Sequence, residues 1–426
     1  MKYVKVKDLG QIVTGNTPPT TDGSYYGDFM PFIKATDIPL GSRFTYNTEQ
    51  CYSEKAYNKY KANLVPKGST CIVTIGSIGK KMTQAHTDLF VNQAINAIIP
   101  FKEFNEDYIY YVTRYAVLPQ LKIYDSGTTS GRENISKSSF SNIRLFVEED
   151  YLTQQKIASI LSAYDSLIEN NTKRIKLLEQ MAENLYKEWF VRFRFPGHEN
   201  VEMKKTKLGK LPCSFSITNM NSVIDYYIGG GWGNDEYSND FPIQASVIRG
   251  ADFPSVTKYD TSTCPNRFHK ESNYKSRQLQ DGDIVMEISG GTSEQPVGRT
   301  VLVTQDLIDR FEDGKLICAS FCKLIRLKKD VISPYYFYYW MQYLYDTRII
   351  DRFQLQSTGI INFKFEPFLK KGDVLMPPKD IMSTFDKYIS SIQKERNSLA
   401  KQNEYLSRQR DLLLPRLMSG KLEVKP

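Results

Sequence analysis

Apolar residues recur at helical spacing over an unusually long stretch in the middle of the chain. Between Tyr151 and Phe195 the sequence contains neither Gly nor Pro, the two residues that most often interrupt a helix. The apolar positions follow the period of an α-helix for about five heptads. They include Ile157, Leu161, Ile168, Ile175, Leu178, Leu185 and Trp189. Because so long an apolar face is usually buried against another helix, the pattern predicts a partner helix elsewhere in the chain.

The partner helix is expected near the C-terminus, from Met382 to Gly420. Its apolar residues form a strict seven-residue series that consists of Phe385, Ile392, Leu399, Leu406 and Leu413. Pro415 should kink or stop this helix, and Gly420 should close it. Since one chain that returns on itself can lay the two helices antiparallel, we expect their apolar faces to meet. Asn171 and Asn403 would then lie at or near the seam and fix its register, or else face solvent.

The rest of the chain has the mixed pattern of an α/β fold. In the first 150 residues, Cys71–Ile75 and Ala94–Pro100 are runs rich in β-branched residues, which predicts strands. Asp107–Leu118 has helical spacing. Gly and Pro are frequent in the segments between these elements, as is typical of turns and loops.

Residues 213–378 repeat the order of features found in residues 1–150. Phe32–Ile38 corresponds to Val247–Phe253, and the helical run after Asp107 corresponds to Pro334–Tyr343. The order is therefore domain, helix, domain, helix. Duplication of one unit is the simplest explanation.

These patterns predict an α+β fold with a pseudo-two-fold internal repeat. Two mixed α/β domains would alternate with two long antiparallel helices that form a coiled-coil-like spacer. The expected divisions are a first domain at 1–150, a central helical spacer at 151–195, a linker at 196–212, a second domain at 213–378, a C-terminal helical spacer at 379–420 and a tail at 421–426. The linker is polar and rich in Lys, as expected between domains.

Composition bounds the function only loosely. The 426 residues carry a formal net charge of +8. This small excess of positive charge weakly favours a polyanionic partner. No stretch has the apolar length of a membrane helix, and the first residues lack a signal-peptide pattern, so we expect a cytoplasmic protein. The six cysteines form no CxxC pair and the three histidines are scattered, so we expect neither a structural zinc site nor a disulfide framework.

The sequence lacks the common catalytic motifs. Neither the (N/D)PP(Y/F) motif of adenine methyltransferases nor a GxxxxGK(S/T) phosphate loop occurs, and Gly229–Gly233 does not fit GxGxxG. Asp281, Asp283 and Glu287 suggest a nuclease carboxylate cluster, but Asp281-Gly-Asp283 is typical of a turn and no Lys stands two residues beyond Glu287. We therefore expect no catalytic, cofactor-binding or metal-binding residues in this chain.

Two segments carry a resemblance to a known family. Leu177–Glu199 contains LYKEWFVRFRFPG, and Asp411–Val424 contains LLPRLMSGKL. Together they resemble the central and C-terminal spacer regions of the specificity subunits of type I restriction-modification systems, the HsdS family. The resemblance covers essentially the whole chain, because the order of domains and helices also agrees.

The resemblance implies a non-catalytic targeting subunit. Each domain would be a target-recognition domain that binds one half of a bipartite, asymmetric site in double-stranded DNA. The helices would set the unread gap and dock two methyltransferase (M) subunits, through which restriction (R) subunits join. S-adenosylmethionine, ATP and Mg²⁺ would belong to those partners and not to this chain. The alternative from another class is a coiled-coil scaffold that organises a multi-subunit complex without binding DNA.

Candidate DNA contacts are basic, hydroxyl and amide side chains in predicted loops. In the first domain they are Lys34, Arg43, Lys80, Lys81, Thr128, Thr129 and Arg132. In the second they are Arg249, Arg267, Lys270, Lys275, Arg277, Arg299, Arg352, Gln354 and Gln356. For each of them an ordinary solvated side chain is the alternative.

Aromatic residues gather at helical spacing in both copies, at Tyr108–Tyr111 and Tyr335–Trp340. Exposed aromatic rings could stack on bases. Because both clusters repeat at equivalent helical positions, we expect these rings in the domain cores instead.

Overall fold

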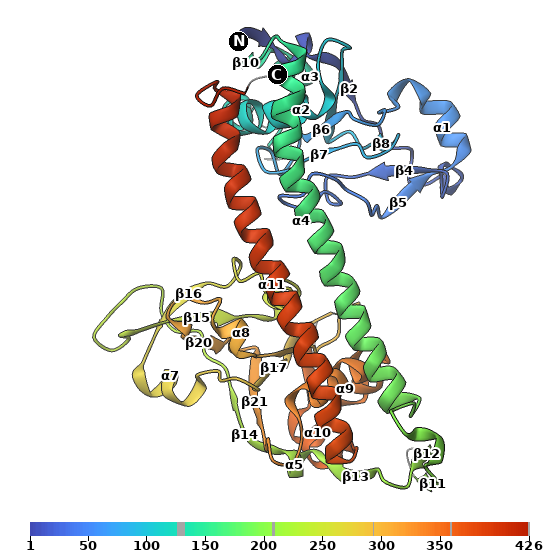
Figure 1. The fold of residues 1–426 in the computed structure, drawn as a ribbon, viewed down its shortest axis with the longest axis vertical. Helices are drawn as coiled ribbons and strands as arrows, with labels where there is room; N and C mark the ends of the chain where they lie inside the picture. The colour runs from blue at the N-terminus through green and yellow to red at the C-terminus, as the bar shows by residue number, and fades with distance from the viewer. Residues whose placement is uncertain (126–132, 207–208, 293, 358–359, 425–426) are drawn as a thin grey trace. The chain divides into compact units, whose positions relative to one another are not determined.

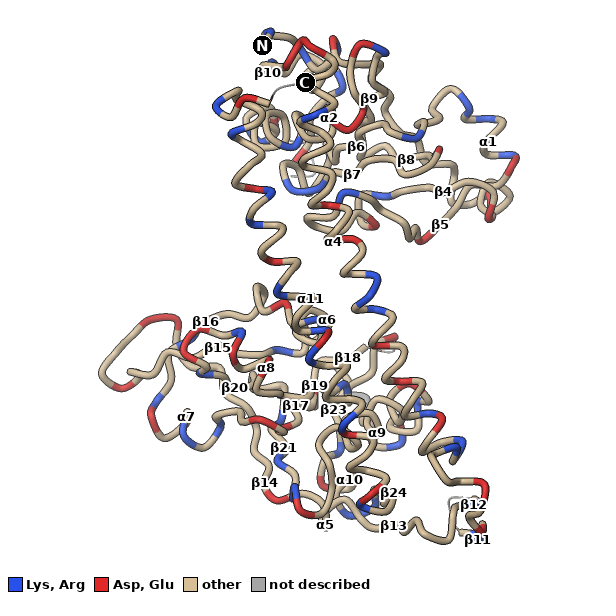
Figure 2. Tube along the Cα trace, in the orientation of Figure 1, with Lys and Arg blue, Asp and Glu red and all other residues tan. Residues whose placement is uncertain are grey.

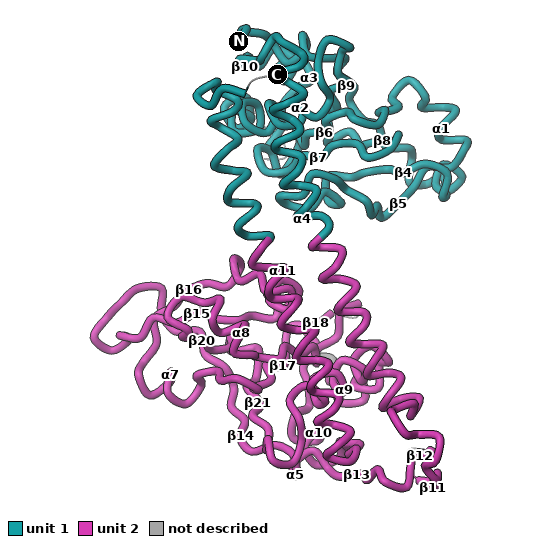
Figure 3. The backbone as a smooth tube through the Cα atoms, in the orientation of Figure 1, with its two compact units in different colours: residues 1–170, 403–426 teal, residues 171–402 magenta. Residues whose placement is uncertain are grey.

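The computed structural model describes residues 1–125, 133–206, 209–292, 294–357 and 360–424 (Figure 1). The chain divides into two compact units (Figure 3). Unit 1 contains residues 1–170 and 403–426, and unit 2 contains residues 171–402. Each unit combines an α/β part with segments of two long helices, which confirms the α+β class.

The two long helices are α4, Tyr151–Tyr186, and α11, Lys379–Met418. At the start of α4, the Asp150 carboxylate accepts a hydrogen bond of 2.7 Å from the backbone N–H of Thr153, which satisfies one of the free amides of the first turn. A π-helical turn, Lys187–Val191, continues α4 at its end. Both helices contribute residues to both units.

We expected Pro415 either to kink or to stop α11, and the second of these expectations is wrong. The helix does not stop there and continues to Met418. Proline removes only the hydrogen bond to the carbonyl four residues earlier, that of Asp411, and Asp411 is exposed so that water can replace it. Gly420 closes the helix as expected, with φ of +71° and its N–H bonded to the Leu417 carbonyl.

The α/β part of unit 1 is built on two small sheets and a ribbon. The antiparallel sheet has the order β2 (Gly10–Thr14), β9 (Ile95–Pro100), β6 (Thr70–Val73), β7 (Met82–Gln84). The second sheet has the order β3 (Tyr26–Gly27), β5 (Gln50–Tyr52), β4 (Met30–Ile33), β8 (Phe90–Val91), with β4 and β8 parallel. The ribbon pairs β1 (Lys2–Lys5) with β10 (Arg144–Val147), and the short helices are α1 (Glu54–Tyr60), α2 (Glu106–Val112) and α3 (Lys137–Asn142).

Unit 2 contains the counterparts of these sheets. Its antiparallel sheet has the order β14 (Ile224–Gly229), β21 (Cys322–Leu327), β17 (Ile284–Glu287), β19 (Thr300–Leu302). Its second sheet has the order β16 (Asn266–His269), β15 (Ile243–Ile248), β20 (Leu316–Cys318), with β15 and β20 parallel. The ribbon pairs β13 (Ser216–Asn219) with β24 (Asp373–Met376).

Unit 2 also carries further elements. They are a sheet of β18 (Ser289–Gly291), β23 (Ile360–Phe363) and β22 (Gln354–Ser357), and a hairpin of β11 (Met203–Thr206) and β12 (Gly209–Pro212). Its short helices are α5 (Met220–Val223), α6 (Phe253–Val256), α7 (Glu271–Arg277), α8 (Gln305–Ile308), α9 (Pro334–Asp346) and α10 (Phe365–Lys371).

The two units share one topology, which confirms the internal repeat. In both four-stranded sheets, the first and third strands in sequence lie at the edges, and the last strand lies between the first and the second. In both, the second sheet contains one parallel pair formed by strands far apart in sequence. Among the described residues of unit 1, the counterpart of the β18–β23 pair is an isolated bridge between Ile75 and Asn134.

The aromatic clusters lie in the cores, as predicted. On α2, Tyr108, Tyr110 and Tyr111 are fully buried. On α9, the buried rings are those of Tyr336, Phe337, Tyr339 and Trp340. Both helices begin with a side-chain cap, because Asn105 accepts from the Tyr108 amide and Ser333 from the Tyr336 amide.

The apolar faces of α4 and α11 meet in both units. In unit 1, Ile157 and Leu161 share a buried cluster with Leu414 and Leu417. The burial shifts from the predicted Leu413, which is half-buried, because a seven-residue repeat drifts by about 20° per heptad on a straight helix. Ile168 and Leu406 are also half-buried.

In unit 2 the seam contains most of the predicted residues. Ile175 and Leu399 share one cluster, Phe385 and Ile392 lie in another, and Leu178 and Leu185 pack against it. The Trp189 and Phe385 rings are 6.0 Å apart. Residue numbers rise along α4 as they fall along α11, so the segments run antiparallel within each unit.

Asn171 lies in the seam rather than in solvent. It is 6% exposed, and its amide donates a 3.4 Å hydrogen bond to the Gln402 side chain. Asn403 is half-buried. Among the described residues, no helix is both long and apolar enough to cross a membrane.

Candidate nucleic-acid interface

A charged surface of unit 2 lies around α7 and the Gly-rich loop, Gly229–Gly233, and its exposed acidic residues are Asp235, Glu236 and Glu271. Lys270 immediately precedes α7 and Lys275 lies on it, and both are exposed. Arg277 is half-buried, and its guanidinium donates a 3.0 Å hydrogen bond to the carbonyl of Gly229. This bond ties the helix to the Gly-rich loop, so that the two can approach a ligand together. Figure 2 shows the charged residues along this part of the chain.

Arg267 and Trp232 form a second feature of this surface. The Arg267 guanidinium lies 4.6 Å from the centre of the exposed Trp232 ring and forms an ion pair with Asp235. The Arg267 side chain is only 11% exposed. It therefore orients an exposed indole rather than reaching far into solvent itself.

The corresponding surface of unit 1 lies on α1, and sequence reasoning missed it. Lys55 and Lys59 are exposed, and each places its ammonium group 4.5 Å from the centre of the Tyr25 ring. A hydrogen bond to the Tyr25 hydroxyl raises the pKa of Lys59, so this residue stays cationic. Phe29 is 49% exposed and meets Tyr57 edge to face. The internal repeat could have indicated this surface, because α1 occupies the same position in unit 1 as α7 does in unit 2.

Arg43 does not belong to an exposed surface, contrary to our prediction of a DNA contact. It is 7% exposed, donates a 2.7 Å hydrogen bond to Gln84 and forms an ion pair with Asp107. Burial lowers its pKa, but Tyr111 and Asp107 outweigh this effect and raise it. A buried guanidinium with these partners has a structural role.

Arg249 and Arg299 are also occupied by internal partners. Arg249 forms two 2.9 Å bonds to the Asp252 carboxylate. Arg299 forms two 2.8 Å bonds to Glu287 and one of 2.9 Å to the carbonyl of Gly250. Bidentate pairs of this kind hold loops in place. The guanidinium groups of Arg249 and Arg299 are therefore held by bonds within unit 2.

The other predicted contacts are divided between exposed and bound side chains. Lys80 and Arg352 are exposed. Lys34 pairs with Glu49 at 3.0 Å, and Lys81 donates to the carbonyl of Ala35 at 3.0 Å. Gln354 donates to Asp351 at 2.9 Å. Thr128, Thr129, Arg132 and the side chain of Gln356 lie outside the described residues.

Of the three acidic residues considered for a nuclease site, Asp283 and Glu287 are paired with arginines and Asp281 with Lys329. Asp283 accepts bonds of 2.8 and 2.7 Å from Arg326, and Glu287 accepts from Arg299. Asp283 is fully buried. Within the part of the chain that the structure describes, no group of three or more His, Cys, Asp or Glu is placed to hold a metal ion.

Comparison with known proteins finds similar proteins in one family. The family model described as "Type I restriction modification DNA specificity domain" matches residues 1–180. The specificity subunit of the type I restriction enzyme MjaIX from Methanocaldococcus jannaschii is 25% identical, over 99% of this chain and 93% of that protein. The HindI specificity subunit from Haemophilus influenzae is 31% identical over 41% of this chain and 38% of its own length.

A solved structure shares the fold. The crystal structure of the S subunit of a type I restriction-modification system from M. genitalium has a TM-score of 0.56 and 12% sequence identity, and covers 100% of this chain and 96% of that one. The duplicated topology, the two long helices and the matches in sequence agree. Residues 1–180 therefore match the DNA specificity domain of type I restriction-modification systems, and the whole chain is similar to their specificity subunits, the non-catalytic subunits that direct such complexes to DNA.

Proposed function

We propose that residues 1–150 and 213–378 are two target-recognition domains, each of which binds one half of a bipartite site in double-stranded DNA. The observation that carries this proposal is the duplicated sheet topology of the two units. A chain that contains the same binding fold twice can engage two separate short sequences. The divisions at 151–195, 196–212, 379–420 and 421–426 then correspond to spacer, linker, second spacer and tail.

Differences between the copies explain why the two half-sites would differ in sequence. Lys34 in unit 1 stands where unit 2 has Arg249, and both begin a turn closed by an aspartate side chain three residues later. The loop after β2 is GNTPPT, whereas the loop after β14 begins GGWGND. Since these loops present different side chains on the same scaffold, the recognised DNA is expected to be asymmetric.

The exposed basic side chains are proposed to hold the phosphate backbone. In unit 2 these are Lys270, Lys275 and Arg352, and in unit 1 they are Lys80, Lys55 and Lys59. Lysine side chains on a surface mainly contribute affinity and register, while base edges are read by side chains in the adjacent loops. The Gly-rich loop beside Arg277 is a candidate for reading base edges, because glycine lets the backbone come close to the DNA.

The long helices are proposed to dock two M subunits. Leu177 on α4 in unit 2 is 63% exposed, and Tyr405 on α11 in unit 1 is 64% exposed. Both stand at the same position relative to the first residue of their helix. Large apolar side chains at equivalent exposed positions indicate two equivalent protein interfaces.

The remaining partners follow from this assembly. R subunits would join through the M subunits, and S-adenosylmethionine, ATP and Mg²⁺ would bind to these partners. A complex that acts on DNA in this way is expected in the cytoplasm. The scaffold alternative predicts no sequence-selective binding by either unit, and the family comparisons do not favour it.

The test is to purify this chain with its M subunit and to sequence the DNA that the complex methylates. We expect one bipartite motif with a methylated adenine in each half. The Lys270→Ala/Lys275→Ala variant should lower methylation without changing the motif. Methylation without a motif, or a motif with a single half, would overturn the proposal.

A further inference from the structure

A buried polar network connects the α/β part of unit 1 to both of its helix segments. Tyr111 on α2 is fully buried and donates a hydrogen bond to Asp165 on α4. Asp165 also forms an ion pair with Arg410 on α11. Asp165 is 7% exposed and Arg410 3%. Three elements therefore meet at one carboxylate.

The unit 1 network extends further into the α/β part. The Arg43 guanidinium lies 3.5 Å from the Tyr111 hydroxyl and continues to Gln84 and Asp107. Arg410 also donates a 3.0 Å bond to Asp411. Burial raises the pKa of Tyr111, and Asp165 raises it further, so the phenol keeps its proton and can donate.

Unit 2 has a polar network at the equivalent position. Gln393 on α11 donates a 3.1 Å hydrogen bond to the hydroxyl of Tyr339 on α9. The separation along the chain is 54 residues, the same as between Tyr111 and Asp165. Tyr339 and Gln393 thus occupy in unit 2 the places that Tyr111 and Asp165 occupy in unit 1.

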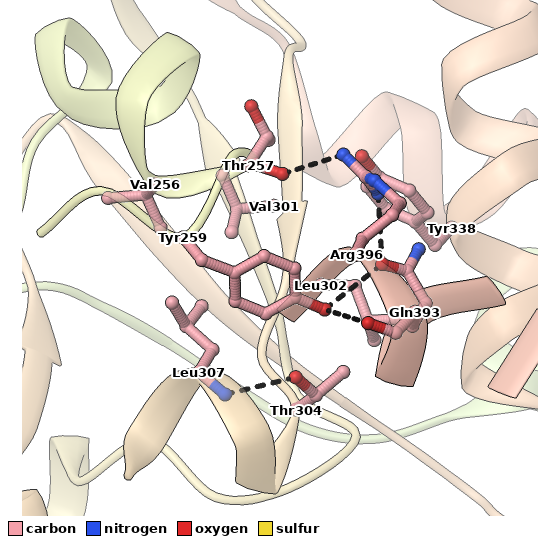
Figure 4. Close-up of a pocket in the computed structure, with 10 residues that line it drawn as sticks. All are labelled: Val256, Thr257, Tyr259, Val301, Leu302, Thr304, Leu307, Tyr338, Gln393 and Arg396. Atoms are coloured by element: carbon pink, nitrogen blue, oxygen red, sulfur yellow. Dashed lines mark hydrogen bonds between the residues drawn. The ribbon is translucent and has the colours of Figure 1, made fainter. Parts of the chain in front are cut away.

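An arginine completes the unit 2 network, as Arg410 does in unit 1. Arg396 donates to Gln393 at 2.9 Å, to the carbonyl of Thr257 at 2.9 Å and to Glu179 on α4 at 3.1 Å. The Tyr259 hydroxyl bonds to the Gln393 side chain at 3.1 Å. Figure 4 shows Tyr259, Gln393 and Arg396 at a small cavity of about 20 Å³. Again, α4, α11 and the α/β part meet at one buried polar group.

Apolar side chains could fill the volume of these polar networks without loss of stability. Buried ion pairs are often no more stabilising than apolar side chains of the same volume, because both charges must be removed from water. Their hydrogen bonds are directional, however, and a shifted domain would leave charges unpaired in the core. The apolar contacts around them have no such angular preference.

We propose that the unit 1 network of Tyr111, Asp165 and Arg410 and the unit 2 network of Tyr339, Gln393 and Arg396 fix the angle of each target-recognition domain on its helix pair, and thereby restrict the complex to one gap length between the half-sites. The six side chains are positioning residues, since they touch no DNA in this scheme. The inference rests on the proposed function and adds the determinant of gap selectivity.

The experiment measures methylation by the complex of this chain with its M subunit on DNA that carries both half-sites at different gap lengths. The decisive variant is Tyr111→Phe, which removes only the hydroxyl group. We expect the ratio of rates on the native gap and on gaps one base pair longer or shorter to fall on the order of tenfold, the usual effect of losing a hydrogen bond to a charged group. Tyr339→Phe should lower the ratio through the other unit, with a smaller effect because its partner is the neutral Gln393 amide.

The matched control is Tyr108→Phe. It removes another buried hydroxyl of α2, one that accepts a 2.8 Å hydrogen bond from the backbone N–H of Glu148 and lies outside the network. This variant should keep the wild-type ratio. If the wild-type complex methylates no bipartite motif, the proposed function itself is refuted. That result differs from a failure of this inference, in which the wild-type complex methylates a bipartite motif but the variants keep its gap ratio.

Two results would overturn the inference. One is an assembled Tyr111→Phe or Tyr339→Phe complex that retains the wild-type gap ratio. The other is a complex that loses methylation equally at every gap length while still assembled, because it would show impaired binding rather than impaired gap selection. If one variant does not assemble, the other decides, since the two networks are in separate units.

Discussion

Gly15 and Gly230 occupy the same position in the two units and make the same close approach to a neighbouring backbone. A Cβ atom on Gly15 would lie 2.1 Å from the carbonyl oxygen of Val91. A Cβ atom on Gly230 would lie 2.2 Å from the carbonyl oxygen of Ala319. Both glycines follow the first strand of the four-stranded sheet and begin the loop proposed to approach DNA.

Alanine at either position is therefore expected to destabilise its unit. The clash is with backbone, which cannot move aside as a flexible side chain can, so the expected loss is about 2–4 kcal/mol. Denaturant unfolding of the Gly15→Ala and Gly230→Ala variants measures it. Gly23→Ala and Gly229→Ala are the controls, because an added Cβ has no atom within 4 Å at either site. Equal stability of the variants and their controls would refute the close approach.

The buried His269 predicts a pH dependence of stability for unit 2. It is 2% exposed, and burial, together with Arg267, lowers its pKa below the ordinary value of 6.5. The unfolded chain then binds a proton at higher pH than the folded one. Stability from this residue is complete above the unfolded pKa and is lost as the pH falls from that value through the lower folded pKa.

The measurement is the Tm of wild-type protein and of the His269→Gln variant between about pH 7.5 and 5.5. We expect the wild-type Tm to fall with decreasing pH and the variant Tm to fall less. The His86→Gln variant, which changes a histidine of unit 1, should leave the pH response of unit 2 intact. A variant with the full wild-type slope would exclude His269 as the cause.

Salt dependence tests the role of α7 in DNA binding. Lys270→Ala/Lys275→Ala should weaken binding to every sequence alike and reduce the slope of log K against log[salt] by about 1 for each phosphate that a lysine no longer neutralises. The control is Lys370→Ala/Lys371→Ala, which removes the same charge from the exposed side of α10. If both pairs change the slope equally, net charge rather than α7 is responsible.

A heptad insertion tests whether the helices set the gap. Within unit 2, Arg174 on α4 and Glu395 on α11 form a 2.7 Å ion pair, so a heptad inserted only in α4, between Arg174 and Leu178, would break such contacts. The insertion therefore belongs between Asn170 and Asn171, with a matching heptad between Gln402 and Asn403.

Seven residues lengthen a helix by about 10 Å, which corresponds to about 3 base pairs of DNA. We expect the methylated motif to gain about this number of unread base pairs. A complex that methylates the original gap at the wild-type rate would contradict the spacer role.

The long helices and the duplication could be predicted from sequence because both are periodic. Helical periodicity places Ile157, Leu161 and Trp189 on one face without reference to the rest of the chain. The shift of burial from Leu413 to Leu414 was not foreseen, because the pitch mismatch accumulates over several heptads.

Long-range pairings could not be predicted in the same way. The parallel contact of β4 with β8 joins segments about 60 residues apart, and local patterns do not contain it. The same limit applies to Arg43: its sequence neighbourhood is that of an exposed loop, and only the fold brings Asp107 and Gln84 to its guanidinium. Charge in a predicted loop therefore selected both Lys270 and Lys275, which are exposed, and Arg43, which the fold buries.

The most direct test of the central claim is a domain exchange followed by sequencing of methylated DNA. Residues 1–150 are replaced by the first domain of another specificity subunit, and the complex with the M subunit is assayed. We predict that one half of the methylated motif changes while the other half and the gap stay as in wild type. A change in both halves, or in neither, would contradict two independent target-recognition domains.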